Sequence, residues 1–264
     1  MSDEGIKLKL PFIEDKDLPC VSIITPTRNK KLFKLAVYQF LKFDYPRHKL
    51  EWIILDNGTD RVKKYLDYKD DSNLIYMTLD GTKRYSIGEL RNTCIEKASY
   101  DIIVYMDDDD FYPPESVVCR VKSLLKYFHR GIECVGVVDC LTYNIHDKSC
   151  DVSSNSSTYF LEASMCHTKR FWNKRKFNKD MCLEVKYFLR DRHKQMIAIP
   201  FQFVIIVFNH SNNFTGRGNR VIKKNDKLDN VQIGRAGNIQ IMLKDNSYID
   251  TILTDEIKKI IYEE

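Results

Sequence analysis

Glycine is scarce in this chain, which has 10 glycines and 7 prolines among 264 residues. The segment TPTRNKK at 25–31 contains no glycine. This absence excludes a glycine-rich phosphate-binding loop after the first apolar run. The eight cysteines form no C-x-x-C pair, which argues against a zinc site. The longest apolar stretch, 197–208, is too short to span a bilayer.

The charge balance is only mildly basic. The chain has 42 Lys and Arg against 37 Asp and Glu, a formal net charge of +5. This excess is weak evidence for an anionic ligand, and no nucleic-acid-binding pattern accompanies it. Residues 1–10 lack the apolar core of a signal peptide. Cys94 and Cys119 fall in helical patterns, as reduced core cysteines do. We therefore expect a cytoplasmic protein without a transmembrane segment and without nucleic acid as a partner.

Short apolar runs alternate with helical patterns through the first half of the chain. Strands are predicted at 21–25, 52–55, 74–79, 102–106 and 135–138, with Pro26 ending the first of them. Helices are predicted at 31–42, from about 59 to 68, at 86–98 and at 114–128. Ser86 and Glu89 have the spacing of a capping box. The alternation predicts an α/β fold with a mostly parallel sheet and helices on both faces.

The second half is less regular. Residues 141–167 are polar and suggest a loop or hairpin, 170–192 are helical in pattern with a break near Asn178, and 196–208 suggest one or two strands. We expect one domain over 1–210, with a nucleotide-binding half at 18–140 and an acceptor half at 141–210 that contains a small mixed sheet. Residues 211–264 form a polar extension that ends in a helix at 254–262.

The four consecutive aspartates at 107–110 are the most informative feature. They directly follow the apolar run 102–106, and Pro113 and Pro114 close the segment. Carboxylates at the carboxyl end of a buried strand lie where open α/β sheets bind ligands. Because like charges this close repel each other, they favour a divalent cation as a partner.

Four ordered segments resemble glycosyltransferase family 2, whose members are inverting nucleotide-sugar transferases of GT-A fold. The segments are VSIITPTRN at 21–29, WIILDNGTD at 52–60, GELRNTCIEKA at 88–98 and YMDDDDFYPPE at 105–115. The resemblance runs from about 21 to 210. It implies a sugar transfer from a nucleotide-diphosphate donor, with a UDP-sugar as the expected donor, to a hydroxyl of a glycan, protein or lipid-linked acceptor. The expected cofactor is Mn²⁺ or Mg²⁺.

The resemblance also implies roles for individual residues. Asp109 contacts the metal directly, Asp107 and Asp108 hold the ribose or the water ligands of the metal, and His210 contacts the metal or the diphosphate. Asp56 accepts a hydrogen bond from the nucleobase, and Asn57 stands where a second Asp is common. The remaining implied donor contacts come from Thr25, Pro26, Arg28 and Arg91.

The catalytic base is implied by an E-D-x-x-x-x-x-R pattern at the start of a helix. Here Glu184 occupies the aspartate position, six residues before Arg190. An inverting displacement needs one carboxylate to take the proton of the acceptor hydroxyl. Asp180 and Asp191 are competing candidates for this role. The segment 164–172 lies where the family builds its acceptor side, and Arg217 and Arg220 are candidates to close on the phosphates.

Two other functions stay open on the sequence. A sugar nucleotidyltransferase would share the sheet but needs the glycine-rich loop that is absent. A catalytically inactive domain that binds a nucleotide sugar or a partner is compatible with the departures at Asn57 and Glu184. The sugar, the acceptor, the linkage and the oligomeric state do not follow from the sequence.

Overall fold

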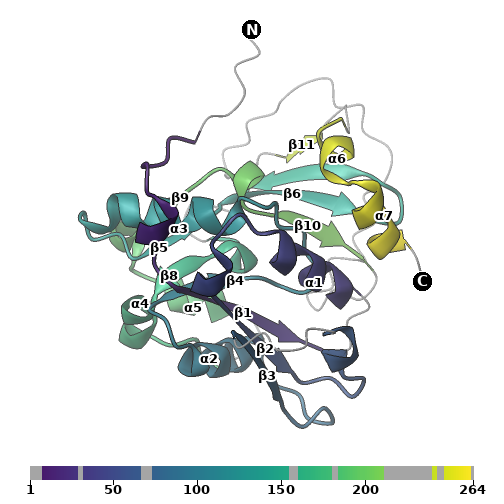
Figure 1. Ribbon diagram of the computed structural model, residues 1–264, viewed down its shortest axis with the longest axis horizontal. Coiled ribbons are helices and arrows are strands. Elements are labelled where there is room, and N and C mark those ends of the chain that lie inside the picture. Colours follow the sequence, from purple (N-terminus) through teal and green to yellow (C-terminus); the bar gives the residue numbers. More distant parts are fainter. Residues whose placement is uncertain are drawn as a thin grey trace, which may run out of the picture.

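The computed structural model describes residues 8–28, 32–66, 73–154, 160–179, 184–210, 240–242 and 247–262. Two sheets and the helices around them make up this part of the chain (Figure 1). The first sheet has seven strands and the second has four. The expected fold class, a mixed α/β architecture with a large mostly parallel sheet and a small second sheet, is confirmed.

The large sheet has the strand order β3-β2-β1-β4-β8-β5-β9. Its pairs are parallel except those that β8 makes with β4 and β5. Side chains of its central strands are buried on both faces, as covered parallel sheets require. Its strands are β1 (Val21–Thr27), β2 (Leu50–Asp56), β3 (Leu74–Thr78), β4 (Ile102–Tyr105), β5 (Cys134–Gly136), β8 (Cys166–Thr168) and β9 (Met196–Ala198).

Helices cover both faces of this sheet, as predicted. Ile23 and Ile54 pack in one buried cluster with residues of α1 (Phe33–Lys42) and α3 (Ser116–Phe128). Their neighbours Ile24 and Ile53 point the other way and pack with residues of α2, α4 and α5. These three helices span Ile87–Lys97, Lys169–Lys174 and Glu184–Leu189.

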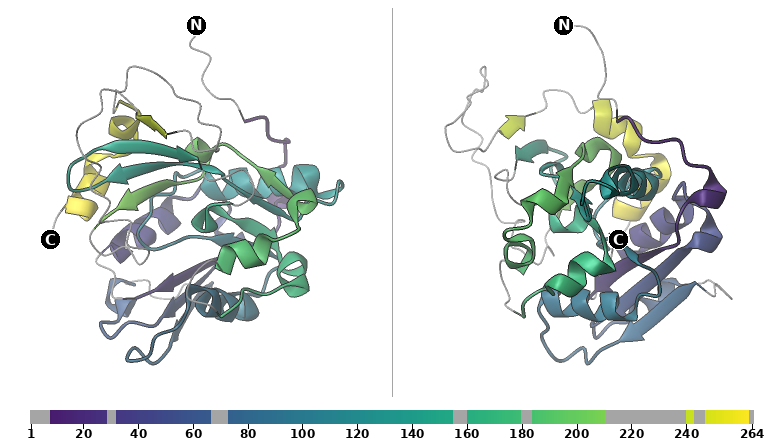
Figure 2. Two further views of the ribbon diagram at one scale, coloured as in Figure 1. Left: turned by 180° about the vertical axis from the view of Figure 1, so that it is seen from behind. Right: turned by 90° about the vertical axis from the view of Figure 1, so that its left-hand side faces the viewer.

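The second sheet has the order β10-β6-β7-β11 and mixed strand directions. Its strands are β6 (Asp139–Asn144), β7 (Cys150–Ser154), β10 (Ile206–Asn209) and β11 (Gln240–Met242). The predicted hairpin is therefore β6–β7. The sheet joins a third buried cluster with α1 and the C-terminal helices α6 (Ser247–Ile252) and α7 (Asp255–Tyr262). In Figure 2 these helices lie at the opposite end of the molecule from α4 and α5.

Three local expectations differ from the structure. Pro26 does not end β1. Thr25, Pro26 and Thr27 all stay in register with β2, so the strand accommodates the missing N–H of the proline. The helix expected to reach 68 is a single 3-10 turn, Val62–Tyr65, and residues 67–72 lie outside the described part. The tail contributes more core than expected, since Ile249, Leu253, Ile257 and Ile261 are buried.

The remaining 3-10 turns are Asp15–Asp17, Arg47–Lys49, Glu162–Ser164, His193–Gln195 and Phe201–Phe203. The capping box of α2 is present, with the side chains and backbone amides of Ser86 and Glu89 bonded reciprocally. Cys94 and Cys119 are free and buried, as predicted. Within the described helices, none is both long and apolar enough to cross a bilayer. The division of the chain at residue 210 stays a prediction.

Candidate active site

The site forms where the strand order of the large sheet reverses. β1 pairs with β2 on one side and with β4 on the other, so the loops after these strands leave the same edge in different directions. Ligands of open α/β sheets bind at such a point. A cavity of about 200 Å³ opens here. It is lined by Pro26, Thr27, Arg28, Asn57, Tyr85, Ile87, Leu90, Arg91, Asp107, Asp108, Asp109, Asp110, Leu161, Glu162, Ala163, Glu184 and Val207.

Asp109 and His210 converge at the acidic loop. Oδ2 of Asp109 lies 3.1 Å from Nε2 of His210, and both side chains are largely buried. A carboxylate oxygen and an imidazole nitrogen are both suitable ligands for Mn²⁺. In the part of the chain that the structure describes, no three His, Cys, Asp or Glu side chains group closely enough to hold a metal alone. A pair of protein ligands suits a metal that completes its coordination with substrate phosphates and water.

Asp108 and Asp110 fasten the acidic loop to the surrounding strands. The Thr27 hydroxyl at the end of β1 donates a short hydrogen bond to Asp108 Oδ2. The backbone N–H of Phe208 on β10 donates to Asp110 Oδ1 at 3.0 Å. Asp108 and Asp110 are both buried, so these bonds are shielded from water. The four aspartates therefore differ in environment although they are consecutive in sequence.

Gln39 on α1 holds the same loop from behind. Its amide nitrogen donates to the carbonyl of Asp110 at 3.0 Å, and its amide oxygen accepts a short bond from the N–H of Tyr112. The side chain is 2% exposed. We did not predict this residue, because nothing in a helix sequence shows which loop its buried polar side chain will meet. The one available signal was a glutamine beside Phe40 on the apolar face.

Arg91 on α2 lies between the acidic loop and the candidate base. Its Nη2 is 3.6 Å from Asp107 Oδ2, and its Nη1 is 3.7 Å from Glu184 Oε1. The guanidinium is 3% exposed, and its Nε and Nη1 have no hydrogen-bond partner within the described residues. Arg91 also lines the cavity, so a buried guanidinium with unused donors lies at its wall. It can therefore bind an oxygen-rich ligand without first giving up a hydrogen bond.

Glu184 begins α5 and is 7% exposed. Burial raises the pKa of its carboxyl group, and the nearby charges of Glu162 and Asp107 act in the same direction. Its own backbone N–H and the Arg91 guanidinium lower the pKa in part. A carboxylate with a raised pKa is a better proton acceptor than an ordinary surface glutamate.

Glu162 also lines the cavity, on the 3-10 turn that precedes β8. We did not single it out, because the expectation for this region was the later segment 164–172. Part of that segment is instead β8 inside the large sheet. There His167 is fully buried, its Nε2 lies 2.9 Å from the Tyr105 hydroxyl, and burial lowers its pKa to about 4. The second wall of the cavity thus comes from residues 161–163.

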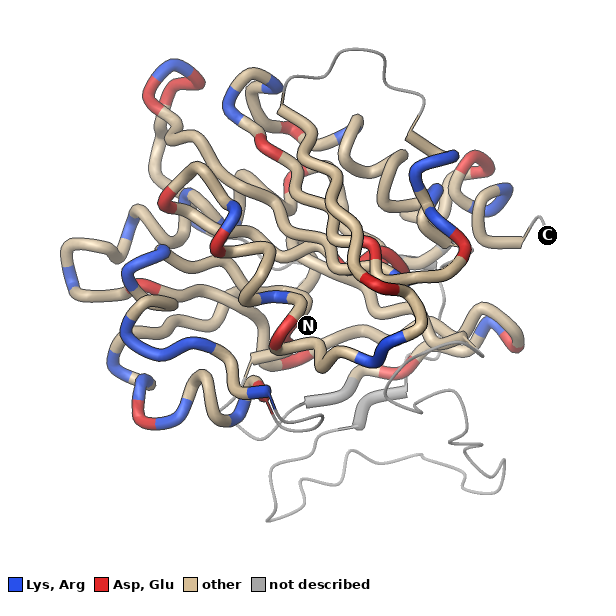
Figure 3. The backbone as a smooth tube through the Cα atoms, turned by 90° about the horizontal axis from the view of Figure 1, so that it is seen from below, with Lys and Arg blue, Asp and Glu red and all other residues tan. Residues whose placement is uncertain are grey.

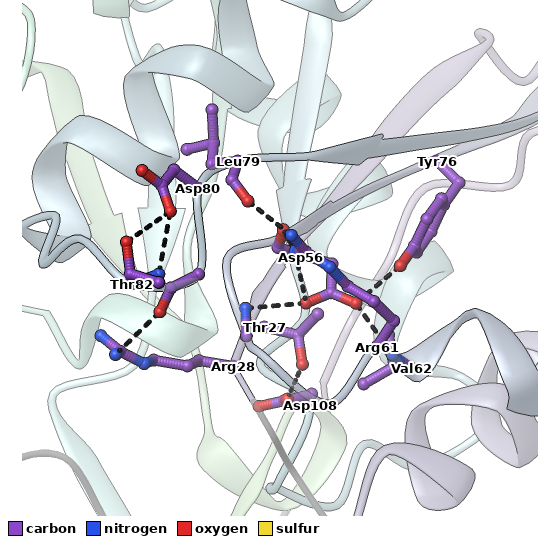
Figure 4. Close-up of polar contacts among 12 residues, drawn as sticks. Thr27, Arg28, Asp56, Arg61, Val62, Tyr76, Leu79, Asp80, Thr82 and Asp108 are labelled. Atoms are coloured by element: carbon purple, nitrogen blue, oxygen red, sulfur yellow. Dashed lines mark hydrogen bonds and ion pairs between the residues drawn. The ribbon is translucent and has the colours of Figure 1, made fainter.

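Asp56 is fully buried at the end of β2 and supports the turn that follows. Its carboxylate accepts hydrogen bonds from the N–H of Gly58 at 2.9 Å, the N–H of Val62 at 2.8 Å and the hydroxyl of Tyr76 at 2.6 Å (Figure 4). Arg61 lies 3.5 Å from the same group. Asp56 is not among the residues that line the cavity.

Asn57 is the next residue and does line the cavity. It is 2% exposed, and its Oδ1 has no hydrogen-bond partner among the residues that the structure describes. Pro26 and Arg28 line the cavity as well, whereas the Thr25 hydroxyl accepts a bond from the Trp52 indole at 2.9 Å. Arg28 donates to the carbonyl of Gly81 at 3.4 Å (Figure 4).

The structure thus brings most of the predicted site residues to one cavity. Thr25, Asp56 and His210 are not among the lining residues, although His210 contacts Asp109, which is one of them. Of the competing bases, Asp191 is exposed at a positive φ of 61°, away from the lining residues. Asp180, Arg217 and Arg220 lie outside the described residues.

The chain has recognisable relatives. The family model described as glycosyl transferase family 2 matches residues 22–183. An uncharacterized protein of Haemophilus influenzae is 23% identical over an alignment of 172 residues, and the match covers 54% of this chain and 89% of that protein.

Solved structures share the fold. The mannosyltransferase PcManGT from Pyrobaculum calidifontis, in complex with GDP-Man and Mn²⁺, matches 80% of this chain with a TM-score of 0.59 and 17% identity. TarS 1–349 of S. aureus in complex with UDP matches 71% with a TM-score of 0.56 and 14% identity. The matches span 62% and 60% of those chains, respectively.

The family match covers more than half of the sequence and includes the cavity-lining residues from Pro26 to Ala163, whereas Glu184 and Val207 lie beyond its end. The expected family and enzyme class are therefore confirmed, and this chain is a glycosyltransferase that belongs to glycosyl transferase family 2.

Proposed function

We propose that this protein is a metal-dependent, inverting transferase that moves a sugar from a nucleotide-diphosphate donor to an acceptor hydroxyl. The observation that carries the proposal is the arrangement of charged groups at one cavity: Arg91 contacts both Asp107 of the acidic loop and Glu184, and Asp109 of the same loop lies beside His210. Such an arrangement can neutralise a leaving diphosphate at one end and remove a proton at the other.

Asp109 and His210 would hold Mn²⁺ or Mg²⁺ together with the diphosphate of the donor. The metal supplies Lewis-acid stabilisation of the leaving group when it is bound. PcManGT binds Mn²⁺ with GDP-Man, which supports the cofactor part of the proposal. Arg91 lines the same cavity and has donors without a hydrogen-bond partner among the described residues, so we place its guanidinium on an oxygen of the diphosphate or of the sugar.

Glu184 is the proposed base. The acceptor oxygen forms a bond to the anomeric carbon, the bond from that carbon to the diphosphate oxygen breaks with its electron pair, and the hydroxyl proton passes to a carboxylate oxygen of Glu184. Burial favours the protonated product state of this carboxyl group, as its raised pKa indicates. Glu162 lies on the same side and would position the acceptor.

We place recognition of the nucleobase on Asn57 and keep Asp56 as the residue that fixes the turn. The carboxylate of Asp56 already accepts three hydrogen bonds, whereas Asn57 lines the cavity and its buried Oδ1 has no hydrogen-bond partner among the described residues. An amide can donate and accept at once, which matches the adjacent N–H and C=O of uracil. TarS binds UDP, which is consistent with a UDP-sugar donor.

A screen of UDP-, GDP- and dTDP-sugars by thermal shift and by donor hydrolysis, with Mn²⁺ and with EDTA, tests the proposal. We expect one donor to stabilise the protein only with metal and to be hydrolysed slowly. Binding without hydrolysis or transfer to any acceptor would indicate an inactive nucleotide-sugar-binding domain. No response to any nucleotide would contradict the donor site.

A further inference from the structure

A strongly basic surface lies on the outer side of α4 and α5. Helix α5 begins with Glu184. The described residues 169–179 and 184–194 contain ten Lys and Arg and two acidic residues. Arg192 and Glu184 are both buried, so nine of these Lys and Arg and one acid, Asp191, are at least partly exposed. Figure 3 shows Lys and Arg gathered at the left side of the molecule, where α4 and α5 lie in Figure 1.

This surface also exposes aromatic rings. Five large apolar or aromatic side chains of the described residues are notably exposed, and two of them, Phe128 and Tyr187, lie here at 41% and 39% exposure. The guanidinium of Arg170 lies over the Phe128 ring at 5.4 Å. Arg175 and Arg190 lie over the Tyr187 ring at 5.7 and 5.9 Å.

Helix α4 makes the surface continuous. Arg170 at its start contacts Phe128, and Arg175 at its end contacts Tyr187. Arg170 and Lys174 of the same helix both form ion pairs with the carboxylate of Glu133, at 3.0 and 2.7 Å. The two exposed rings therefore belong to one basic surface, which we call the α4–α5 surface and define by Phe128, Arg170, Lys174, Arg175, Lys179, Lys186, Tyr187, Arg190 and Lys194.

We propose that the α4–α5 surface docks on an anionic lipid bilayer. Clustered Lys and Arg are attracted to anionic headgroups, and amphipathic aromatic rings insert at the headgroup level. A soluble polyanion or a nucleic acid would use the charges but would gain little from burying the apolar ring of Phe128. The combination of both features on one surface favours the bilayer.

Docking in this way would bring the cavity close to the membrane. Glu184 lies three residues before Tyr187 on α5, which is about 5 Å along a helix axis. Given the proposed transfer reaction, on which this consequence rests, the acceptor would be a hydroxyl presented at the bilayer surface. Docking itself requires neither a donor nor turnover.

Co-sedimentation with vesicles tests the proposal on the full chain. We expect binding to vesicles that contain 30% phosphatidylglycerol in phosphatidylcholine, weak binding to pure phosphatidylcholine, and release at 0.5 M NaCl because exposed charges are screened. Replacement of Lys179, Arg190 and Lys194 by Glu should reduce binding at least tenfold. A matched control replaces Lys34, Lys42 and Lys63, on the α1 side, by Glu and should bind like the wild type.

The double variant Phe128→Ser/Tyr187→Ser keeps every charge and separates the possible partners. Reduced vesicle binding by this variant supports the bilayer. Equal losses in both charge variants, or binding to heparin and DNA with no binding to vesicles, would overturn the proposal. Circular dichroism of each variant checks that a loss does not reflect unfolding. If donor hydrolysis is absent while vesicles still bind, the proposed transfer fails and the docking surface stands.

Discussion

The guanidinium of Arg91 lies 3.7 Å from the carboxylate of Glu184, in a site where both side chains are nearly inaccessible to water. The same guanidinium is 3.6 Å from Asp107. One residue of α2 therefore links the acidic loop after β4 with the candidate base on α5. This relationship couples the ionisation of the base to the end of the site where the diphosphate would bind.

Replacement of Arg91 by Met should shift the pH dependence of transfer. Glu184 must be deprotonated to act as a base, so activity rises as the pH passes through its pKa. Arg91 lowers this pKa against the larger effect of burial, and its removal should move the rising limb to higher pH. The kcat/KM profile of the variant, measured from pH 5 to 9, checks the shift. An unchanged limb would show that another group titrates.

Replacement of Glu184 by Gln should slow transfer strongly and preserve the fold. A general base contributes about 10²- to 10⁴-fold, so we expect a loss of that size in kcat with little change in donor binding. Burial raises the pKa of Glu184 in the folded state. Ionisation of this group therefore destabilises the folded protein once the pH rises above the pKa that Glu184 has in the unfolded chain. The variant should therefore have a higher Tm than the wild type at pH 7 and no such advantage at pH 4. Full activity in the variant would move the base elsewhere.

The acidic loop provides a test of which aspartates bind metal. In the structure Asp110 accepts a bond from the backbone of Phe208, whereas Asp109 faces His210. Asp110→Asn keeps the accepting oxygen and should leave the Mn²⁺ requirement within about threefold of wild type. Asp110→Ala removes this oxygen and should change the Mn²⁺ requirement by more than that. Asp109→Asn should raise the Mn²⁺ concentration for half-maximal activity by about 10- to 100-fold. Equal effects of the two Asn variants would contradict this division of roles.

Gln39 should affect the metal site although it never reaches the cavity. Gln39→Met removes the bonds to the Asp110 carbonyl and to the Tyr112 N–H at similar side-chain volume. Loss of a buried hydrogen bond costs about 1–3 kcal/mol when the partner is left unpaired. We expect lower stability to urea and a weaker Mn²⁺ response. Leu41→Ser, an exposed change two residues away, is the control and should change neither.

Asn57 and Asp56 should give opposite phenotypes. Asn57→Asp removes the amide donor that we assign to recognition of the nucleobase. This variant should raise KM for the UDP-sugar about 10- to 100-fold with little change in Tm. Asp56→Ala removes the acceptor of three turn bonds and should lower Tm clearly. Donor titrations and thermal unfolding of both variants measure the difference. A stable Asp56→Ala protein that binds the nucleobase poorly would show that Asp56, and not Asn57, recognises the nucleobase.

The elements of the large sheet followed from local patterns. The runs at 102–106 and 52–55 are short, apolar and closed by turn residues, so β4 and β2 were predictable, and the capping box located the start of α2. Pro26 misled the prediction because a proline can occupy a parallel strand when its missing N–H is not required.

The contacts across the site did not follow from the sequence. The bonds of Gln39 to Asp110 and of Phe208 to Asp110 join residues 71 and 98 positions apart, and no local pattern reports such distances. The family resemblance located Glu184 but not Glu162, because the second residue lies on a short turn without a motif. The same limit applies to α6, whose buried Ile249 is set in a polar tail.

Mn²⁺ binding in the presence of UDP, followed by electron paramagnetic resonance, tests the central claim most directly. The account predicts that the wild-type protein binds one Mn²⁺ tightly only when UDP is present, because Asp109 and His210 would supply two ligands and the diphosphate and water the rest. Asp109→Asn should lose this binding, and Asp110→Asn should keep it. Tight Mn²⁺ binding that ignores UDP, or none in either condition, would contradict the account.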